Sequence, residues 1–186
     1  MTTSQKLPIS LDELLTLKLT PPPFFFFWGH TGSPIEVDKA CLSQWAKWSF
    51  VIDGVLYQTA EHYMMAEKAR LFGDEEMLGK IMKSKTPQMA KRHGRNVAGF
   101  DKDVWEEHCH SIVRRGNIAK FTQNELAWNF LKSTAGKVLV EASPYDDIWG
   151  IGMREDTRGV SDPSKWNGTN WLGFILTEVR EELLRT

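Results

Sequence analysis

The most regular pattern of hydrophobic and polar positions lies between Tyr57 and Phe72. A helix that begins near Thr59 would place on one stripe the side chains Glu61, Met64, Met65, Lys68 and Phe72. Glu61 and Lys68 are the charged members of this apolar stripe, and charges among apolar groups are costly unless they pair. The pattern therefore indicates a structural ion pair, two side chains that reach the edge of the stripe, or a catalytic pair with shifted pKa values.

The same reasoning predicts the other elements. Phe24 to Phe27 is a β-prone run that is apolar on both faces, so we expect a strand buried on both sides. Asp53-Gly54 lies between two short β-prone runs and is a favoured hairpin turn. Asp103 is a suitable start for a helix over 104–120, and Thr122 to Glu125 form a capping box for a helix over 123–132. Similar start and stop signals predict helices over 75–83, 87–93 and 170–184. A strand is expected over 137–142.

The first 23 residues differ from the rest of the chain. Ser10 to Glu13 is a capping box that opens a short amphipathic helix, and Pro21 to Pro23 end it. We expect residues 1–23 to be a partly mobile appendage and residues 24–186 to form one domain. A chain of 186 residues buries roughly 70% of its unfolded surface around one core without metal or disulfides.

Composition and length fit an ordinary globular chain, with 41% hydrophobic and 25% charged residues. No apolar run approaches the roughly 20 residues of a membrane helix, and the N-terminus lacks the pattern of a secretory signal. We therefore expect no membrane partner. Cys41 and Cys109 are the two cysteines, so an intracellular, cytoplasmic setting is expected.

Charge is unevenly distributed along the chain. The formal net charge of -1 argues against binding nucleic acid over the whole surface. Between Met77 and Phe100, however, there is no acidic residue, and six lysines and arginines, including Arg95, add positive charge. This segment is either a local anion site or the solvated face of two short helices.

Familiar chemical motifs are absent from the sequence. His108, Cys109 and His110 are successive residues of a predicted helix, point in different directions and cannot converge on one metal ion. We therefore predict no metal, and without a nucleotide-binding loop we predict no cofactor. The tryptophan rings of Trp28, Trp45 and Trp149 could stack on a nucleobase or pack in the core. The other remaining candidates are Glu61 with Lys68, the pair Asp146-Asp147, Arg95, and the glycine-rich loop with Gly150 and Gly152.

At these residues the chain resembles the NADAR (YbiA-like) family, from Phe24 to Leu184. The motifs that carry the resemblance are Leu42-Ser43-Gln44-Trp45, the Asp53-Gly54 hairpin, Glu61 to Ala69, Gly94-Arg95, Ala119-Lys120-Phe121, Leu139 to Pro144, Trp149 to Gly152, Asn170 to Gly173 and Glu178-Val179-Arg180. The resemblance implies a mostly helical α+β domain that hydrolyses N-glycosidic bonds of ribosylated compounds. The substrates associated with the family are ADP-ribosylated guanine and phosphorylated ribosylamino-pyrimidine intermediates of riboflavin synthesis.

Two positions depart from the family pattern. Gln44 stands where the family usually has Asn, which keeps an amide on a side chain one methylene longer. The segment from Ala46 to Ser49 replaces a turn that contains proline. The resemblance implies that Ser43, Gln44 and Trp45 belong to a substrate pocket whose wall differs here in shape.

Three functions follow from this resemblance. The first is removal of ADP-ribose from guanine, as a nucleotide or in nucleic acid, by Glu61 and Lys68, with Lys68 forming a Schiff base or Glu61 activating water. The second is the same chemistry on a riboflavin intermediate, and the third is a module that binds ADP-ribose without cleaving it. Arg95 and the backbone from Asn170 to Gly173, at the start of the last helix, are expected to bind the diphosphate. Trp149 would then line the ribose or stack on a base, and Asp147, Gly150 and Gly152 are further candidates for substrate binding.

Overall fold

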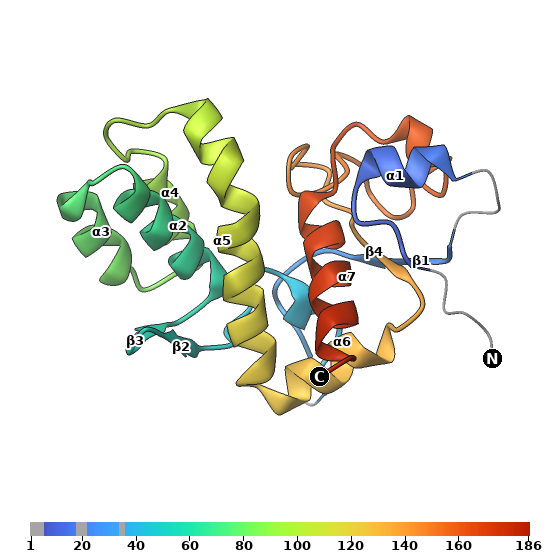
Figure 1. Cartoon of the computed structure of the whole chain (residues 1–186), viewed down its shortest axis with the longest axis horizontal. Helices are drawn as coiled ribbons and strands as arrows, with labels where there is room; N and C mark the ends of the chain where they lie inside the picture. Colours follow the sequence, from blue (N-terminus) through green and yellow to red (C-terminus); the bar gives the residue numbers. More distant parts are fainter. Residues whose placement is uncertain (1–5, 18–21, 34–35) are drawn as a thin grey trace. The chain divides into compact units, whose positions relative to one another are not determined.

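The computed structural model describes residues 6–17, 22–33 and 36–186. It divides into two compact units, which are traced in Figure 1. The terminal unit contains the two ends of the chain, up to Gly29 and from Phe130, and the central unit contains His30–Asn129. Helices predominate among the described residues, whose strands form two small sheets, so the predicted α+β class is confirmed.

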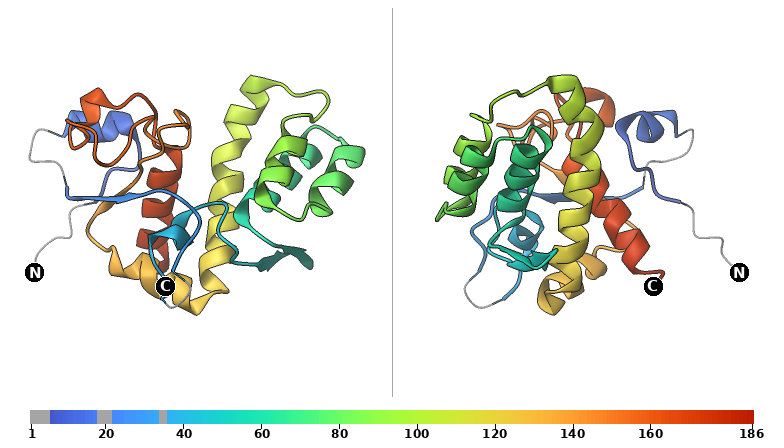
Figure 2. Two further views of the ribbon diagram at one scale, coloured as in Figure 1. Left: turned by 180° about the vertical axis from the view of Figure 1, so that it is seen from behind. Right: turned by 60° about the vertical axis from the view of Figure 1, so that its left-hand side comes forward.

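In the terminal unit, two strands from opposite ends of the chain pair with each other. Strand β1 (Phe24–Phe27) lies parallel to β4 (Val138–Glu141), with Phe24 opposite Val138 and Phe27 opposite Glu141. Helix α7 (Trp171–Leu183) packs on β4 (Figure 2). We predicted that β1 is buried on both sides, and the structure agrees only in part. Phe24 and Phe26 contact the core and Phe25 contacts the ring of Phe130, but these three residues are half-buried and only Phe27 is fully buried.

The core of the terminal unit includes the N-terminal helix. Helix α1 (Leu11–Thr16) begins at its N-cap Ser10, as predicted, and buries Leu14 in the core cluster. This packing ties residues 11–16 to the core. Residues 1–5 and 18–21, which include Pro21, lie outside the described residues. The boundary between the appendage and the domain at residue 24 therefore stays a prediction. The cluster consists of Leu14, Val138, Val140, Ala142, Ile151, Met153, Val160 and Phe174.

A buried arginine joins α7 to the turn before β4. Arg180 is fully buried, and its Nη1 and Nη2 donate to the carbonyl oxygens of Thr134 and Lys137 at 2.8 and 2.7 Å. These bonds supply the partners that a buried guanidinium requires. The remaining elements of this part of the chain are α6 (Glu125–Ser133), which crosses the boundary between the units, and the short helix η2 (Pro163–Lys165).

The central unit is organised around α2 (Ala60–Leu71). The helix begins at the predicted place, where Thr59 caps it because its side chain accepts from the N–H of His62. Glycines on two neighbouring helices let α2 pack closely, since a Cβ at Gly116 would overlap the ring of Tyr63 and one at Gly94 would overlap Met65. The other elements are η1 (Lys39–Leu42), β2 (Phe50–Ile52), β3 (Val55–Tyr57), α3 (Glu75–Met82), α4 (Pro87–Gly94) and α5 (Lys102–Thr122).

Two predicted helix starts are wrong. Helix α5 begins at Lys102 because the side chain of Asp101, not Asp103, caps it by accepting from the N–H of Val104 at 3.0 Å. Helix α5 then continues to Thr122, whose hydroxyl donates back to the carbonyl oxygen of Ile118 at 2.8 Å. Thr122 therefore does not form a capping box, and α6 begins at Glu125.

Candidate active site

The first turn of α2 buries a carboxylate. Glu61 is 2% exposed, and its backbone N–H donates to the carbonyl oxygen of Gln44 at 2.9 Å. Met64 and Met65 are buried on the same helix, as the stripe in the sequence indicates. The neighbouring His62 is structural, because its ring nitrogens contact Thr59 Oγ1 at 2.8 Å and the Ser84 carbonyl at 3.1 Å, and burial lowers its pKa.

Lys68, two turns further along α2, is half-buried beside aromatic rings. Its Nζ lies 4.0 Å from the ring centroid of Phe100 and 5.7 Å from that of Trp105. Burial lowers the pKa of Lys68, and the positive charge of Arg95 lowers it further. Both effects favour the neutral amine, which is the form that reacts with a carbonyl carbon.

The segment Ser43 to Trp45 is held by two side chains of α5. Asn117 Nδ2 donates to Gln44 Oε1 at 3.0 Å, and Lys120 Nζ donates to the carbonyl oxygen of Ser43 at 2.9 Å. The amide of Gln44 thus forms a hydrogen bond inside the central unit. The backbone bond from Glu61 to Gln44 connects this segment to α2.

Sequence reasoning assigned no role to Asn117 or Lys120. Both are fully buried, and burial lowers the pKa of Lys120 to about 8. A signal was present in the sequence, because the two polar residues lie three positions apart on a helical face that also carries Val113 and Phe121. Their partners, however, lie more than 70 positions away, with separations of 73 and 77 residues.

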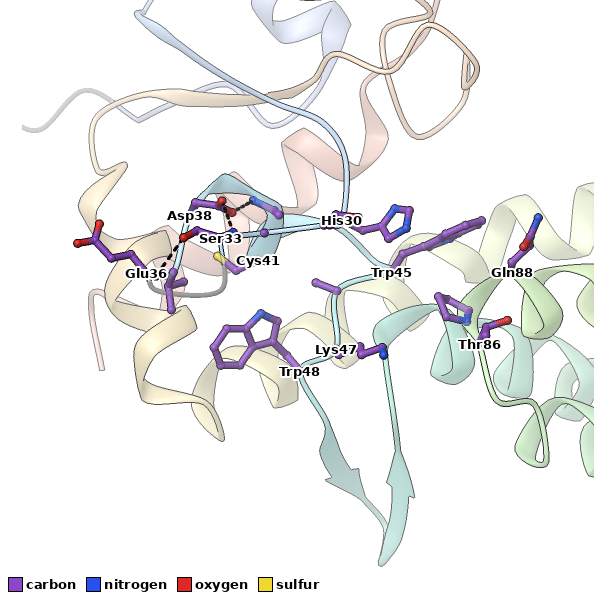
Figure 3. Close-up of a pocket in the computed structure, with 16 residues that line it drawn as sticks. His30, Ser33, Glu36, Asp38, Cys41, Trp45, Lys47, Trp48, Thr86 and Gln88 are labelled. Atoms are coloured by element: carbon purple, nitrogen blue, oxygen red, sulfur yellow. Dashed lines mark hydrogen bonds between the residues drawn. The ribbon is translucent and has the colours of Figure 1, made fainter.

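A pocket of about 730 Å³ opens beside this segment within the central unit (Figure 3). Trp45 lines it, and the centroid of the Trp45 ring lies 5.1 Å from that of His30. At the opposite end, Asp38 accepts hydrogen bonds from the N–H groups of Ser33 and Ala40 at 2.9 and 2.8 Å. The pocket has the size of a small-molecule site.

The candidate residues of the terminal unit lie mainly in the loop after β4. Asp146 Oδ1 accepts from the N–H of Trp149 at 2.8 Å, and the rings of Trp149 and Trp171 are 5.7 Å apart. A Cβ at Gly150 would lie 2.8 Å from the Glu141 carbonyl oxygen, so the loop requires glycine there. The other candidates of this unit are the exposed Asp147, Gly152 at φ 63°, and the exposed Trp28, whose ring contacts Tyr145 at 6.0 Å.

The start of α7 does not offer the free N–H groups that we expected for a diphosphate. The N–H groups of Asn170, Trp171 and Leu172 donate to the carbonyl oxygens of Gly150, Ile148 and Trp149 at 3.0, 3.3 and 3.0 Å. The side chain of Asn170 is also engaged, accepting from Glu141 N at 2.9 Å and donating to Leu139 O at 3.0 Å. For these three N–H groups the expected physical basis is wrong, because carbonyl oxygens of the preceding loop already accept their hydrogen bonds. Diphosphate binding at this end of α7 stays a prediction.

The two sets of candidates therefore belong to different units. Within the central unit, hydrogen bonds connect Ser43, Gln44 and Glu61 through α2 and α5, and Arg95 acts on Lys68. Within the terminal unit, Trp149, Gly150 and Asn170 share the network between the loop and α7. Whether any of these residues contacts substrate stays a prediction.

No three histidine, cysteine, aspartate or glutamate residues of the described chain are arranged to hold a metal ion. Among the described residues, no helix is both long and apolar enough to cross a membrane.

Comparisons with known proteins identify relatives of this chain. The N-glycosidase R617 of Acanthamoeba polyphaga mimivirus is 44% identical over 126 residues, which are 68% of this chain and 74% of the relative. The N-glycosidase YbiA of Escherichia coli is 32% identical over 146 residues, covering 78% and 82%. The maize chloroplastic riboflavin biosynthesis protein PYRR is 34% identical over 141 residues, which cover 72% of this chain and 21% of the relative.

The fold comparison agrees with the sequence comparisons. The NMR structure of E. coli YbiA matches with a TM-score of 0.69 and 27% identity, over 96% of this chain and 94% of that one. N-glycosidases are hydrolases that act on N-glycosidic bonds, so the predicted enzyme class is confirmed at the level of the family. The profile of the NADAR domain matches residues 26–184, and the chain therefore belongs to the NADAR family.

Proposed function

We propose that this chain removes ADP-ribose from ADP-ribosylated guanine by cleaving the bond between ribose C1 and the guanine nitrogen. The observation that carries the proposal is the setting of Lys68. Burial and the neighbouring Arg95 lower the pKa of its amine, and the rings of Phe100 and Trp105 lie beside it. Because its pKa is lowered, this amine is neutral in a larger fraction of molecules than an exposed lysine at the same pH.

Lys68 is a better candidate nucleophile than Lys120, although burial lowers the pKa of both amines. Lys120 has no exposed surface, and its Nζ donates to the Ser43 carbonyl oxygen. A nucleophile has to reach the substrate carbon, and Lys68 is only half-buried. We therefore assign the attacking amine to Lys68 and a positioning role to Lys120.

The proposed reaction proceeds through an imine. The C1–O4′ bond of the ribose breaks as O4′ takes up a proton, which leaves a C1=N bond to guanine. The neutral amine of Lys68 adds to C1, the C1–N bond to guanine breaks, and the guanine nitrogen leaves with a proton. Loss of the remaining proton from the lysine nitrogen leaves a C1=N bond to Lys68. Water then adds to C1 and releases ADP-ribose, which regenerates the amine; the net reaction consumes one water.

Glu61 is the proposed proton carrier. Its carboxyl group is buried at the start of α2, on the same helix as Lys68. A carboxyl group in such a place delivers a proton to the leaving nitrogen and later takes one from the attacking water. If no imine forms, the same group would activate water for direct attack on C1.

The second candidate function is the same cleavage on a phosphorylated ribosylamino-pyrimidine. The observation that favours it is the similarity to the maize PYRR protein, whose name places it in riboflavin biosynthesis. This chain spans 21% of that relative, so the similarity concerns one part of a longer protein. Both candidate substrates contain a ribosyl C1–N bond, and the proposed residues act on that bond in either case.

Parallel incubations separate these candidates. The purified chain is mixed with ADP-ribosyl-guanosine and, separately, with the ribosylamino-pyrimidine phosphate, and products are followed by mass spectrometry. We expect free ADP-ribose and guanosine from the first substrate at a much higher kcat/KM than any product from the second. The reverse ranking would assign the chain to the riboflavin intermediate, and binding of ADP-ribose without turnover of either would make it a reader module.

A further inference from the structure

The pocket beside Trp45 is formed by segments of the central unit alone. Its lining residues come from the chain after Gly29, from η1, from the turn at Trp45 to Trp48, and from the start of α4. Glu61 and Lys68 are not among them. The pocket therefore differs from the place assigned to the reaction, but it adjoins it, because Gln44, next to Trp45, accepts from the N–H of Glu61 at 2.9 Å.

One end of the pocket combines flat rings with polar side chains. Figure 3 shows His30, Trp45, Thr86 and Gln88 at this end, on three different segments of the chain. Trp45 is half-buried, and its ring is 5.1 Å from that of His30. A flat indole face with hydroxyl and amide groups at its side is the chemistry that recognises a nucleobase, since the base stacks and its edge forms hydrogen bonds.

Charge also differs between the two ends. Lys91 Nζ lies 5.9 Å from the centroid of the Trp45 ring, and the exposed Lys47 lines the pocket. Glu36 and Asp38 lie at the other end (Figure 3). An anionic nucleotide would therefore enter with its base against Trp45 and its phosphates toward the lysines, because the carboxylates repel phosphate.

We infer that the Trp45 end of this pocket binds a nucleobase of the substrate other than the guanine that is released. This inference rests on the proposed function. Two bases fit the description: the adenine of the ADP-ribose group, and a base next to the modified guanine in a nucleic-acid strand. Stacking on an aromatic side chain does not depend on which base is present, so one site serves for either.

Binding measurements with the unmodified chain and three variants test the inference. The variants are Trp45→Ala, Trp45→Phe and His30→Ala, with Leu56→Ala as a control on the exposed face of the β2–β3 hairpin. The probes are ADP, a guanine-containing trinucleotide, and ribose 5-phosphate, which has a sugar phosphate and no base. Calorimetric titration gives each Kd without any turnover, and circular dichroism verifies folding.

We expect Trp45→Ala to weaken binding of a base-containing probe by about 5- to 150-fold, with smaller losses for Trp45→Phe and His30→Ala and none for Leu56→Ala. Loss with ADP identifies the adenine of ADP-ribose, and loss with the trinucleotide alone identifies a neighbouring base. Unchanged binding of both probes in folded variants, or an equal loss for ribose 5-phosphate, would overturn the inference. If the unmodified chain binds ADP through Trp45 but does not cleave ADP-ribosyl-guanosine, the proposed function fails and this base site stands.

Discussion

The Nζ atom of Lys120 donates a hydrogen bond of 2.9 Å to the backbone carbonyl oxygen of Ser43, across 77 positions of the sequence. One turn earlier on α5, Asn117 donates to the side chain of Gln44. These bonds fix a segment that otherwise has little regular structure between η1 and β2. The positions of Gln44 and Trp45 in the central unit therefore depend on polar groups buried in a helix.

Replacing Lys120 by Met tests this dependence. We expect kcat/KM to fall by at least about fivefold, because the Ser43 carbonyl loses its donor and the segment loosens, at a cost of about 1–3 kcal/mol for an unsatisfied buried group. The fold should be retained, since Met fills a similar volume. Lys102→Arg, an exposed change on the same helix, is the control, and a Lys120→Met enzyme with unchanged kinetics would limit Lys120 to packing.

The pH dependence of stability gives a second readout of Lys120. Its pKa is about 8 in the folded chain and 10.5 is the ordinary value, so between these values the unfolded chain binds more protons. The cost of burying the ammonium is fully present below about pH 8 and disappears as the pH rises toward 10.5. The thiol of Cys41, which also interacts with Lys120, has its pKa raised to about 12 and stays protonated in this window.

The unmodified chain should therefore gain stability relative to Lys120→Met between these two pH values, by up to about 1.4 kcal/mol per pH unit. Urea unfolding of both proteins at several pH values measures this difference. Parallel stability curves would show that the ammonium is solvated in the folded chain.

Replacing Glu61 by Gln should leave the fold intact and lower turnover by at least about two decades, because the shape is kept and the ionisable oxygen is lost. Product release from ADP-ribosyl-guanosine is the measurement. Glu76→Gln, on the exposed face of α3, is the matched control and should keep full activity. Normal turnover in a folded Glu61→Gln protein would assign Glu61 to structure.

Adding cyanoborohydride during turnover should trap Lys68 as a stable ribosyl-derived adduct, visible as a mass increase on its peptide. Lys68→Arg should then be inactive, because a guanidinium is not neutral at usable pH and cannot form an imine. Lys80→Arg, on the exposed side of α3, controls for the exchange of lysine for arginine. If no adduct forms while product accumulates, the reaction proceeds by water and Glu61.

Arg95→Ala should weaken binding of ADP-ribose by about 1.5–3 kcal/mol and binding of ribose much less, because a guanidinium forms charge-assisted hydrogen bonds to phosphate. Arg92→Ala removes an exposed arginine of α4, one turn before Arg95, and is the control. Titration with both ligands measures the effect. Equal losses for the two ligands would place Arg95 away from the phosphates.

Gly173→Ala should destabilise the terminal unit by about 1–3 kcal/mol, because the added Cβ would overlap the carbonyl oxygen of Leu139 and the side chain of Asn170. Gly79→Ala is the opposite case: no atom outside its helix lies within 4 Å of the added Cβ, so α3 should gain about 0.5–1 kcal/mol. Thermal or urea unfolding measures both. Similar stabilities for the two variants would mean that α7 shifts to accommodate the methyl group.

Local signals predicted much of the fold. The turn at Asp53 and Gly54 was predictable because both residues adopt the left-handed conformation that this pair favours, with φ of 51° and 76°. Thr59 was predictable as a cap because its partner, the N–H of His62, is three residues away. The start of α5 was missed because Asp101 and Asp103 are both suitable caps and only the bond to Val104 distinguishes them.

The candidate site was harder to predict because its bonds are long-range. Glu61 and Lys68 were identified from their spacing along one helix. In the structure the Glu61 side chain is buried, and partial burial lowers the pKa of Lys68. The contacts of Lys120 with Ser43 and of Asn117 with Gln44 join positions that no local pattern relates. The same holds for α7, whose first N–H groups are occupied by a loop about 20 positions earlier.

The pairing of β1 with β4 joins a strand that is made early in synthesis to one that is made late. Phe24 leaves the ribosome 114 residues before its partner Val138, by the difference 138 − 24. In that interval the four consecutive phenylalanines of β1 have no β4 to pair with, and the segment His30–Asn129, which forms the central unit, is made between the two strands. The growing chain therefore carries an apolar, β-prone segment that has to be kept from other chains until β4 and α7 have been made.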